Sequence, residues 1–270
     1  MSAWNFMDPA SRGNLEQAIR REYEAMVAMA SAPGAWENPT ACGEWQYRDV
    51  IGHLVAVTEG YFVSIDAARG NGDVQMRDVM GFSGDMDQDA RAFRSTSQEE
   101  LLARLDKDFI KLEGIFGDLT DEEWGSLMVT HGHFGPMPVF MFAIFQLVDY
   151  GVHGWDMREG TGMRHAMDGA TADLLSMLAI GLVPSMVHTD EDLKIGLQIT
   201  SGPNAGGHTV STGGPGNAAS VSPGIDPDVA ATIECDPASM ILTWYGRFNT
   251  GTIRGDQDAA HRFLDSIVRI

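Results

Sequence analysis

Apolar residues recur at helical spacing through most of the N-terminal two thirds of the chain. In the segment 14–31 they mark one face of a helix: Leu15, Ile19, Tyr23, Met26 and Val27. Segments 47–68, 97–119, 138–158 and 168–187 carry similar stripes, and Ser97 followed by Glu100 is a capping-box pattern at the start of one of them. This pattern predicts four or five long amphipathic helices packed as a bundle.

The pattern changes after about residue 188. Segments 193–200 and 229–235 alternate as strands do, and the stretch between them is rich in Gly, Pro, Ser and Asn, which favours a loop or hairpin. A helix over 237–246, a short extended piece at 251–255 and a final helix over 256–268 follow. We therefore expect two domains in an α+β fold, a helical bundle over 1–188 and a small α+β domain over 189–270.

Composition narrows the classes of partner. With 38 acidic and 18 basic residues the formal charge is −20, which argues against binding to nucleic acid or to anionic membranes. We find neither a signal sequence nor an uninterrupted apolar run long enough to span a bilayer, so we expect a cytoplasmic protein, monomeric or homodimeric. Cys42 and Cys235 are far apart without metal-ligand spacing, and we expect two free, buried thiols.

A carboxylate and an imidazole stand four residues apart in the apolar stretch "FQLVDYGVHGWDM". On a helix Asp149 and His153 share one face, and His53 on the second predicted helix, beside Gly52, could meet them inside the bundle. Two imidazoles and one carboxylate suit a catalytic divalent ion, because three protein ligands leave coordination positions open. We expect Zn²⁺. The alternative from the residues alone is that His53 is a core histidine hydrogen-bonded to a carbonyl.

The stretches "PTACGEWQYRDVIGHL" (39–54) and "DYGVHGWDM" (149–157) resemble the two metal-binding motifs of the DinB/YfiT-like families, and most closely those of the mycothiol-dependent maleylpyruvate isomerase family. The stretch 232–267 is similar to the sterol-carrier-protein-like C-terminal domain of that family. The resemblance implies a DinB-like four-helix bundle followed by a sterol-carrier-like domain, with metal ligands at His53, Asp149 and His153.

The resemblance also implies a reaction. A metal-held thiolate of mycothiol, or of another low-molecular-weight thiol, adds to an activated alkene; rotation and expulsion then isomerise it, and without expulsion the thiol is transferred. Arg247 resembles a family arginine that reaches toward the metal, where it could bind a substrate carboxylate, and Arg254 is the next candidate. Two alternatives stay open: a thiol-independent isomerase or cyclase of a natural-product intermediate, and a non-catalytic small-molecule binding protein.

Two positions depart from the family pattern. The family usually has Glu where this chain has Asp149, whose shorter arm requires a closer backbone, and commonly Arg where this chain has Gln146. His131 and His133 form an H-x-H pair, which we expect in a loop that leads into the fourth long helix. Trp155 and Asp156 are neighbours of His153 that could orient its ring.

Overall fold

The computed structural model describes residues 4–78, 81–163, 165–247 and 251–268, and the chain divides into two compact units. Of the described residues, those in 6–166 form one unit, and residues 4–5 with those in 167–268 form the other. The predicted α+β, two-domain fold is confirmed. Residue 189, where the sequence pattern changes, lies within the second unit.

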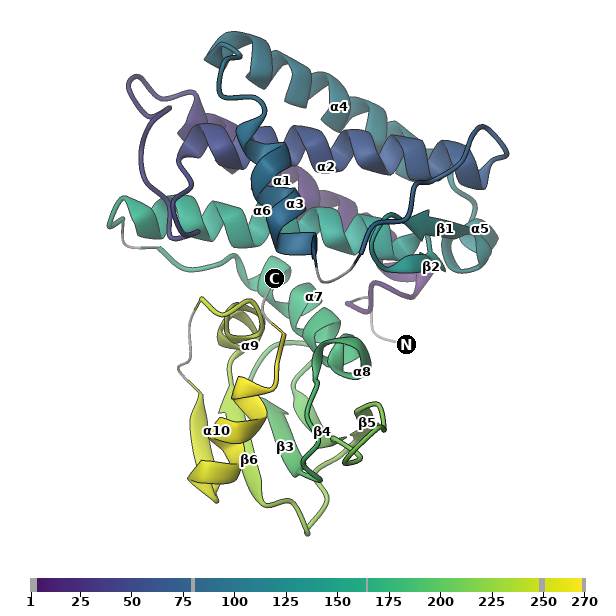
Figure 1. The fold of residues 1–270 in the computed structure, drawn as a ribbon, viewed down its shortest axis with the longest axis vertical. Helices are drawn as coiled ribbons and strands as arrows, with labels where there is room; N and C mark the ends of the chain where they lie inside the picture. Colours follow the sequence, from purple (N-terminus) through teal and green to yellow (C-terminus); the bar gives the residue numbers. More distant parts are fainter. Residues whose placement is uncertain (1–3, 79–80, 164, 248–250, 269–270) are drawn as a thin grey trace. The chain divides into compact units, whose positions relative to one another are not determined.

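The first unit is a bundle of four long helices with short additions (Figure 1). In chain order its elements are η1 (Pro9–Ser11), α1 (Arg12–Ala30), α2 (Tyr47–Ala68), α3 (Phe82–Arg91), α4 (Gln98–Asp118), α5 (Asp121–Ser126), β1 (Met128–His131), β2 (Gly135–Pro138) and α6 (Phe140–Gly160). The long helices are α1, α2, α4 and α6; α1 packs on α6, and α2 packs on both α4 and α6. Strands β1 and β2 form an antiparallel hairpin beside α2.

Helix α2 is the central element of this unit. Its apolar positions Val50, Ile51, Leu54 and Val55 are all fully buried. Among the described residues it alone is long and apolar enough to cross a membrane, yet 61% of the relevant window is buried inside the protein, as in a core helix. Its length and composition therefore follow from its place in the bundle core.

Gly52 allows α3 to approach α2 closely. A Cβ at this position would lie 2.5 Å from the backbone oxygen of Ala90 on α3. Only glycine lets α3 pack this closely against α2.

The second unit contains a five-stranded sheet with helices. Its elements are α7 (Gly169–Gly181), α8 (Val183–Met186), β3 (Lys194–Ile199), β4 (Gly206–Ser211), β5 (Ser220–Pro223), β6 (Ala231–Cys235), α9 (Pro237–Trp244), β7 (Thr252–Gly255) and α10 (Gln257–Asp265). The strand order is β5-β4-β3-β6-β7; β3 and β6 are parallel and the other pairs are antiparallel. The glycine-rich stretch thus contains the hairpin of β4 and β5.

Helix α7 belongs to this second unit because its apolar face packs on α9. Leu174, Leu175 and Leu178 are buried. From the sequence pattern we expected this segment in the helical bundle. That expectation failed because an apolar stripe does not indicate which element packs against it.

Candidate metal centre

The three predicted ligands come together in the first unit. His53 projects from α2, and Asp149 and His153 project from one face of α6, where they stand four residues apart. Each offers a ligand atom, and these atoms all lie within 4.8 Å of one another. Both imidazoles are buried, at 5% and 9% exposure, and the Asp149 side chain is 17% exposed.

The spacing of these atoms suits a shared ion better than a hydrogen bond. His53 Nε2 lies 3.5 Å from Asp149 Oδ1, which is long for a hydrogen bond. Two ligands bound at about 2.0–2.1 Å in a tetrahedral site lie about 3.3–3.4 Å apart. The shorter arm of Asp149 therefore reaches far enough to share an ion with His53.

His153 is oriented by a buried carboxylate. Its Nδ1 lies 2.9 Å from Oδ2 of Asp156, which is fully buried, one turn further along α6. When Nδ1–H donates to Asp156, the lone pair on Nε2 is free to bind a metal. This pairing is the usual way in which proteins fix the tautomer of a metal-binding histidine. Trp155 does not orient His153 in this way, because its ring lies against His165.

His53 does not behave as an ordinary core histidine. In the described part of the chain its Nδ1 is buried without a hydrogen-bond partner, and its Nε2 has only the long contact to Asp149. Buried polar atoms in a core are normally paired, so a purely structural His53 would be expected to contact a carbonyl. The observed surroundings favour the metal-ligand interpretation.

Trp45, from the loop before α2, lies against both imidazoles. Its ring centroid is 5.2 Å from that of His53 and 5.6 Å from that of His153, and the two histidine rings are 5.0 Å apart. The indole N–H donates to Asp87 Oδ1 on α3 at 2.8 Å. Hydrogen bonds from Arg91 and then Trp45 keep the pKa of Asp87 below its usual range. Helix α3, which the sequence pattern did not reveal, therefore anchors one wall of the site.

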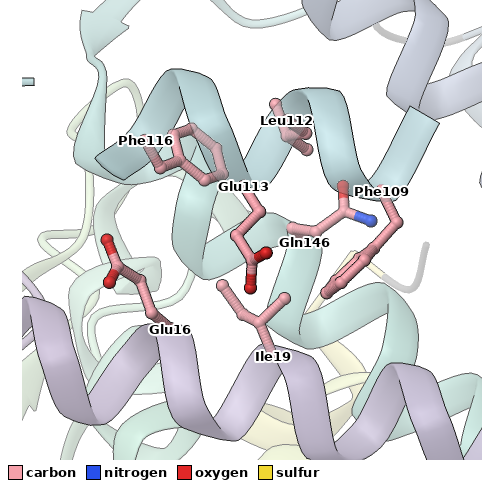
Figure 2. A pocket seen from close by; sticks show the side chains of 7 residues that line it. All are labelled: Glu16, Ile19, Phe109, Leu112, Glu113, Phe116 and Gln146. Atoms are coloured by element: carbon pink, nitrogen blue, oxygen red, sulfur yellow. The ribbon is translucent and has the colours of Figure 1, made fainter. Parts of the chain in front are cut away.

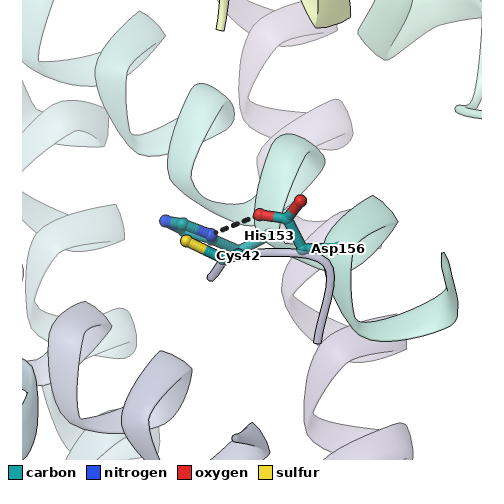
Figure 3. Close-up of side chains that lie close together, drawn as sticks. All are labelled: Cys42, His153 and Asp156. Carbon is teal, nitrogen blue, oxygen red and sulfur yellow. Dashed lines mark hydrogen bonds and ion pairs between the residues drawn. The ribbon is translucent and has the colours of Figure 1, made fainter. Parts of the chain in front are cut away.

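Cys42 lies on the Asp156 side of His153. Figure 3 shows its thiol beside the imidazole and the carboxylate, and the three ligand atoms lie within 4.8 Å of one another. Because Nδ1 of His153 already faces Asp156, a metal ion bound by these three residues would have to replace the hydrogen bond between His153 and Asp156. Neither cysteine forms a disulfide. Cys235 is buried as expected, and burial raises its pKa to about 11, but Cys42 is partly exposed, contrary to the expectation.

The H-x-H pair lies on the β1–β2 hairpin and not in an irregular loop. His131 is the last residue of β1 and His133 follows in the turn. His131 Nδ1 accepts hydrogen bonds from the backbone N–H groups of His133 and Phe134, and His133 Nε2 lies 3.1 Å from Asp85 Oδ2. The described residues place neither histidine in a metal-ligand group.

Gln146, at a position where the family commonly has Arg, is buried and faces the bundle interior. Its Nε2 lies 3.5 Å from Thr58 Oγ1, and it contributes to a pocket between α1, α4 and α6. Figure 2 shows this pocket, which is lined by Glu16, Ile19, Phe109, Leu112, Glu113, Phe116 and Gln146. None of the three predicted ligands lines it, so this pocket is separate from the candidate metal centre.

The two candidate arginines lie in the second unit. Arg247 follows α9 and donates from Nη1 to the backbone oxygen of Tyr245 at 2.8 Å. Arg254, on β7, is exposed and pairs with Glu234 on β6 at 2.6 Å. Arg254 thus has the ordinary place of a surface arginine in an ion pair.

Comparison with known proteins gives the family. The family model described as the mycothiol maleylpyruvate isomerase N-terminal domain matches residues 17–158, more than half of the chain. No curated protein sequence matches significantly. A crystal structure of the mycothiol-dependent maleylpyruvate isomerase has 10% identity and a TM-score of 0.62, covering 90% of this chain and 92% of that one. A histidine-to-alanine mutant of such an isomerase gives 12% identity and a TM-score of 0.61 over the same shares. These structures show a common fold, and on the family model's match the chain belongs to the mycothiol maleylpyruvate isomerase N-terminal domain family.

Proposed function

We propose that this protein is a metal-dependent isomerase or S-transferase that uses a low-molecular-weight thiol, such as mycothiol. The substrate we infer is a small electrophilic alkene, conjugated to a carbonyl and carrying a carboxylate. The observation that carries the proposal is the convergence of His53, Asp149 and His153 from two helices, with His153 held by Asp156. Family membership and the shared fold support it.

The donor set fits a divalent ion with positions left open, and two imidazoles with one carboxylate suit Zn²⁺. When bound, such an ion supplies a Lewis acid that lowers the pKa of a coordinated thiol. His53, Asp149 and His153 would hold it. Asp156 fixes the tautomer of His153, and the Trp45 ring covers both imidazoles and keeps water from that side.

Arg247 is the cation that we propose for the substrate carboxylate. We expect Arg247→Met to raise KM for a carboxylate-bearing substrate and to leave the metal content unchanged. Arg254→Met is the matched control, because Arg254 is an exposed arginine of the same unit. Equal effects of the two variants on KM would remove Arg247 from the proposal.

The central experiment compares ligand variants with a histidine outside the site. His53→Ala and His153→Ala should each lose stoichiometric zinc, whereas His188→Ala, at an exposed position of the second unit, should retain it. Zinc content is measured on purified protein, and turnover of maleylpyruvate is measured with and without mycothiol. Zinc at well below one equivalent in the wild type would rule out a functional metal centre.

The same assay separates the alternatives. Turnover that does not respond to the thiol would favour the thiol-independent isomerase or cyclase, and tight substrate binding without turnover would favour the binding protein. The sterol-carrier-like character of the second unit, the cytoplasmic location and the monomeric or dimeric state stay predictions.

A further inference from the structure

His131 has a tautomer that the hairpin fixes. Two backbone N–H groups, of His133 at 3.2 Å and of Phe134 at 3.4 Å, point at its Nδ1. An atom that accepts these hydrogen bonds carries no proton, so the proton of the neutral ring is on Nε2. No described residue accepts a hydrogen bond from Nε2, and His131 is only partly buried.

The ring of His131 lies between the two helices that supply the metal ligands. On α2 it contacts Tyr61, two turns beyond His53, at a centroid distance of 6.5 Å. On α6 it contacts Phe145, one turn before Asp149, at 6.0 Å. The ring also stacks on Phe134 at 4.8 Å, which fixes its plane.

The charge state of His131 suits a hydrogen-bond donor that does not ionise. Burial, aided by the neighbouring His133, lowers the pKa of His131 to about 4, although Asp149 acts in the opposite direction. The other titratable group of the hairpin, His133, faces Asp85. A neutral imidazole can polarise a carbonyl without giving up its proton, which is a known catalytic use of histidine.

We propose that the Nε2–H of His131 donates a hydrogen bond to the carbonyl or carboxylate oxygen of the electrophilic substrate, and so stabilises the negative charge that forms there. This inference rests on the proposed function. As the S–C bond forms, the alkene π electrons shift to the carbonyl oxygen and give an enolate; when the thiolate leaves, the same electrons restore the alkene. No proton moves to or from His131, which only donates its hydrogen bond to the enolate oxygen.

A pair of substitutions separates the two ends of the imidazole. The Asn side chain places an acceptor where Nδ1 is and nothing where Nε2 is, whereas the Gln side chain places an N–H near Nε2 and no acceptor at Nδ1. His131→Asn should therefore keep the hairpin and lose the donor. His131→Gln should weaken the hairpin and keep the donor.

We expect His131→Asn to keep the wild-type Tm and zinc content and to lose kcat by roughly 100-fold, as for the loss of one oxyanion donor. His131→Gln should have a lower Tm but keep kcat within about 10-fold of wild type. If instead His131→Gln lost more kcat than His131→Asn, in parallel with its lower Tm, the proposal would be overturned and His131 would be a structural residue. A ¹⁵N NMR spectrum of the metal-free protein that shows the proton on Nδ1 would also overturn it.

Binding of maleate decides the inference separately from the proposed reaction. Maleate contains a cis alkene and carboxylates. It has no ketone conjugated to the alkene, so it does not undergo the proposed isomerisation. We expect calorimetry on the zinc-loaded protein to show Kd higher by about 10-fold in His131→Asn and little changed in His131→Gln. If the wild type binds maleate in this way but shows no thiol-dependent turnover, the proposed reaction fails and the donor role stands. Equal Kd values in all three proteins would overturn the donor role.

Discussion

The three histidines of the first unit that bear on chemistry are held in three different ways. His153 donates to a buried carboxylate, His131 accepts from backbone amides, and His53 has only a long contact to Asp149. Each arrangement selects a different state of the ring. A carboxylate favours a metal-binding Nε2 lone pair, while backbone N–H groups favour an Nε2 proton. The same side chain is thereby suited to a ligand role in one place and to a donor role in another.

Asp156 is expected to raise the affinity of His153 for zinc through its hydrogen bond to Nδ1. Asp156→Asn keeps an oxygen that can accept from Nδ1 but removes the negative charge, so the protein should fold while its zinc affinity falls roughly 10–100-fold. Competition with a chromophoric chelator measures this affinity. Asp87→Asn, which changes a carboxylate that contacts Trp45 and not a histidine, should leave it nearly unchanged. If Asp156→Asn kept the wild-type affinity for zinc, the negative charge of Asp156 would have no effect on metal binding by His153.

At the scale of single residues, the sequence could predict those whose position follows from helical spacing. Asp149 and His153 share a helix face because they are four residues apart, and a second helix could bring His53 to them. The tautomer of His131 could not be predicted, because two amides of a hairpin turn set it. Nor could the place of Trp45, which depends on a hydrogen bond to α3.

At the scale of elements, the close packing of α3 on α2 depends on one missing side chain. In Gly52→Ala the new Cβ would meet the Ala90 backbone oxygen at 2.5 Å and the Phe93 ring at 3.3 Å, so α3 must move. We expect a loss of about 1–3 kcal/mol in the free energy of unfolding. Urea denaturation measures it.

Gly60→Ala on the same helix is the matched control. Nothing lies within 4 Å of a Cβ at Gly60, so helix propensity decides and the variant should be more stable by about 0.5–1 kcal/mol. If both variants were stabilised, α3 would not be packed against Gly52 in solution.

The start of α2 carries an ion pair with a definite pH dependence. Burial acts to raise the pKa of Asp49, but bonds from the Arg94 guanidinium at 2.7 and 2.8 Å and from the Gln46 N–H outweigh it, so the pKa is lowered. A lowered folded-state pKa stabilises the fold above the unfolded-state pKa, which is about 4, and this contribution is lost as the pH falls through the folded-state value.

Asp49→Asn should therefore lower the free energy of unfolding at pH 7, by about 1–2 kcal/mol given that the Arg94 side chain is 37% exposed. The difference from wild type should shrink below about pH 4. Urea denaturation at pH 7, 5 and 3.5 checks both statements. Glu191→Gln, which removes an exposed pair with Arg262, serves as control and should change stability by less than about 1 kcal/mol at any of these values. A constant difference across the series would contradict the pKa direction.

Among the elements, those with a strong apolar stripe were predictable and α3 was not. The sequence of α3, "FSGDMDQDAR", has few apolar positions, and only Ala90 is buried. Its helix depends on contacts from elsewhere in the chain, through Gly52 and Trp45. The glycine-rich stretch was expected to form a loop or a hairpin, and the β4–β5 hairpin lies there. Local composition did not decide between the two, because strand pairing is a long-range property.

At the scale of the molecule, two properties bear on any metal measurement. The formal charge of −20 attracts divalent cations to the surface without a site, and the candidate ligands lie in only one of the two compact units. The sequence could predict both the charge and the existence of two units. The extent of the second unit depends on α7 packing on α9, a contact between segments about 60 residues apart that no local pattern reveals.

Specific zinc binding should stabilise the unit that holds the site and leave a signature that surface attraction cannot imitate. Free zinc at 100 times its Kd adds about 2.7 kcal/mol to the free energy of unfolding, or roughly 5–10 °C in Tm for a unit of this size. Scanning calorimetry with zinc, and with magnesium at equal ionic strength, measures the shift, which EDTA should reverse. Magnesium should reproduce only the screening of the −20 charge, equally in wild type and in His53→Ala. If His53→Ala kept the full zinc shift, the ion would be bound elsewhere, because a site that has lost one of three ligands cannot retain the same preference for the folded state.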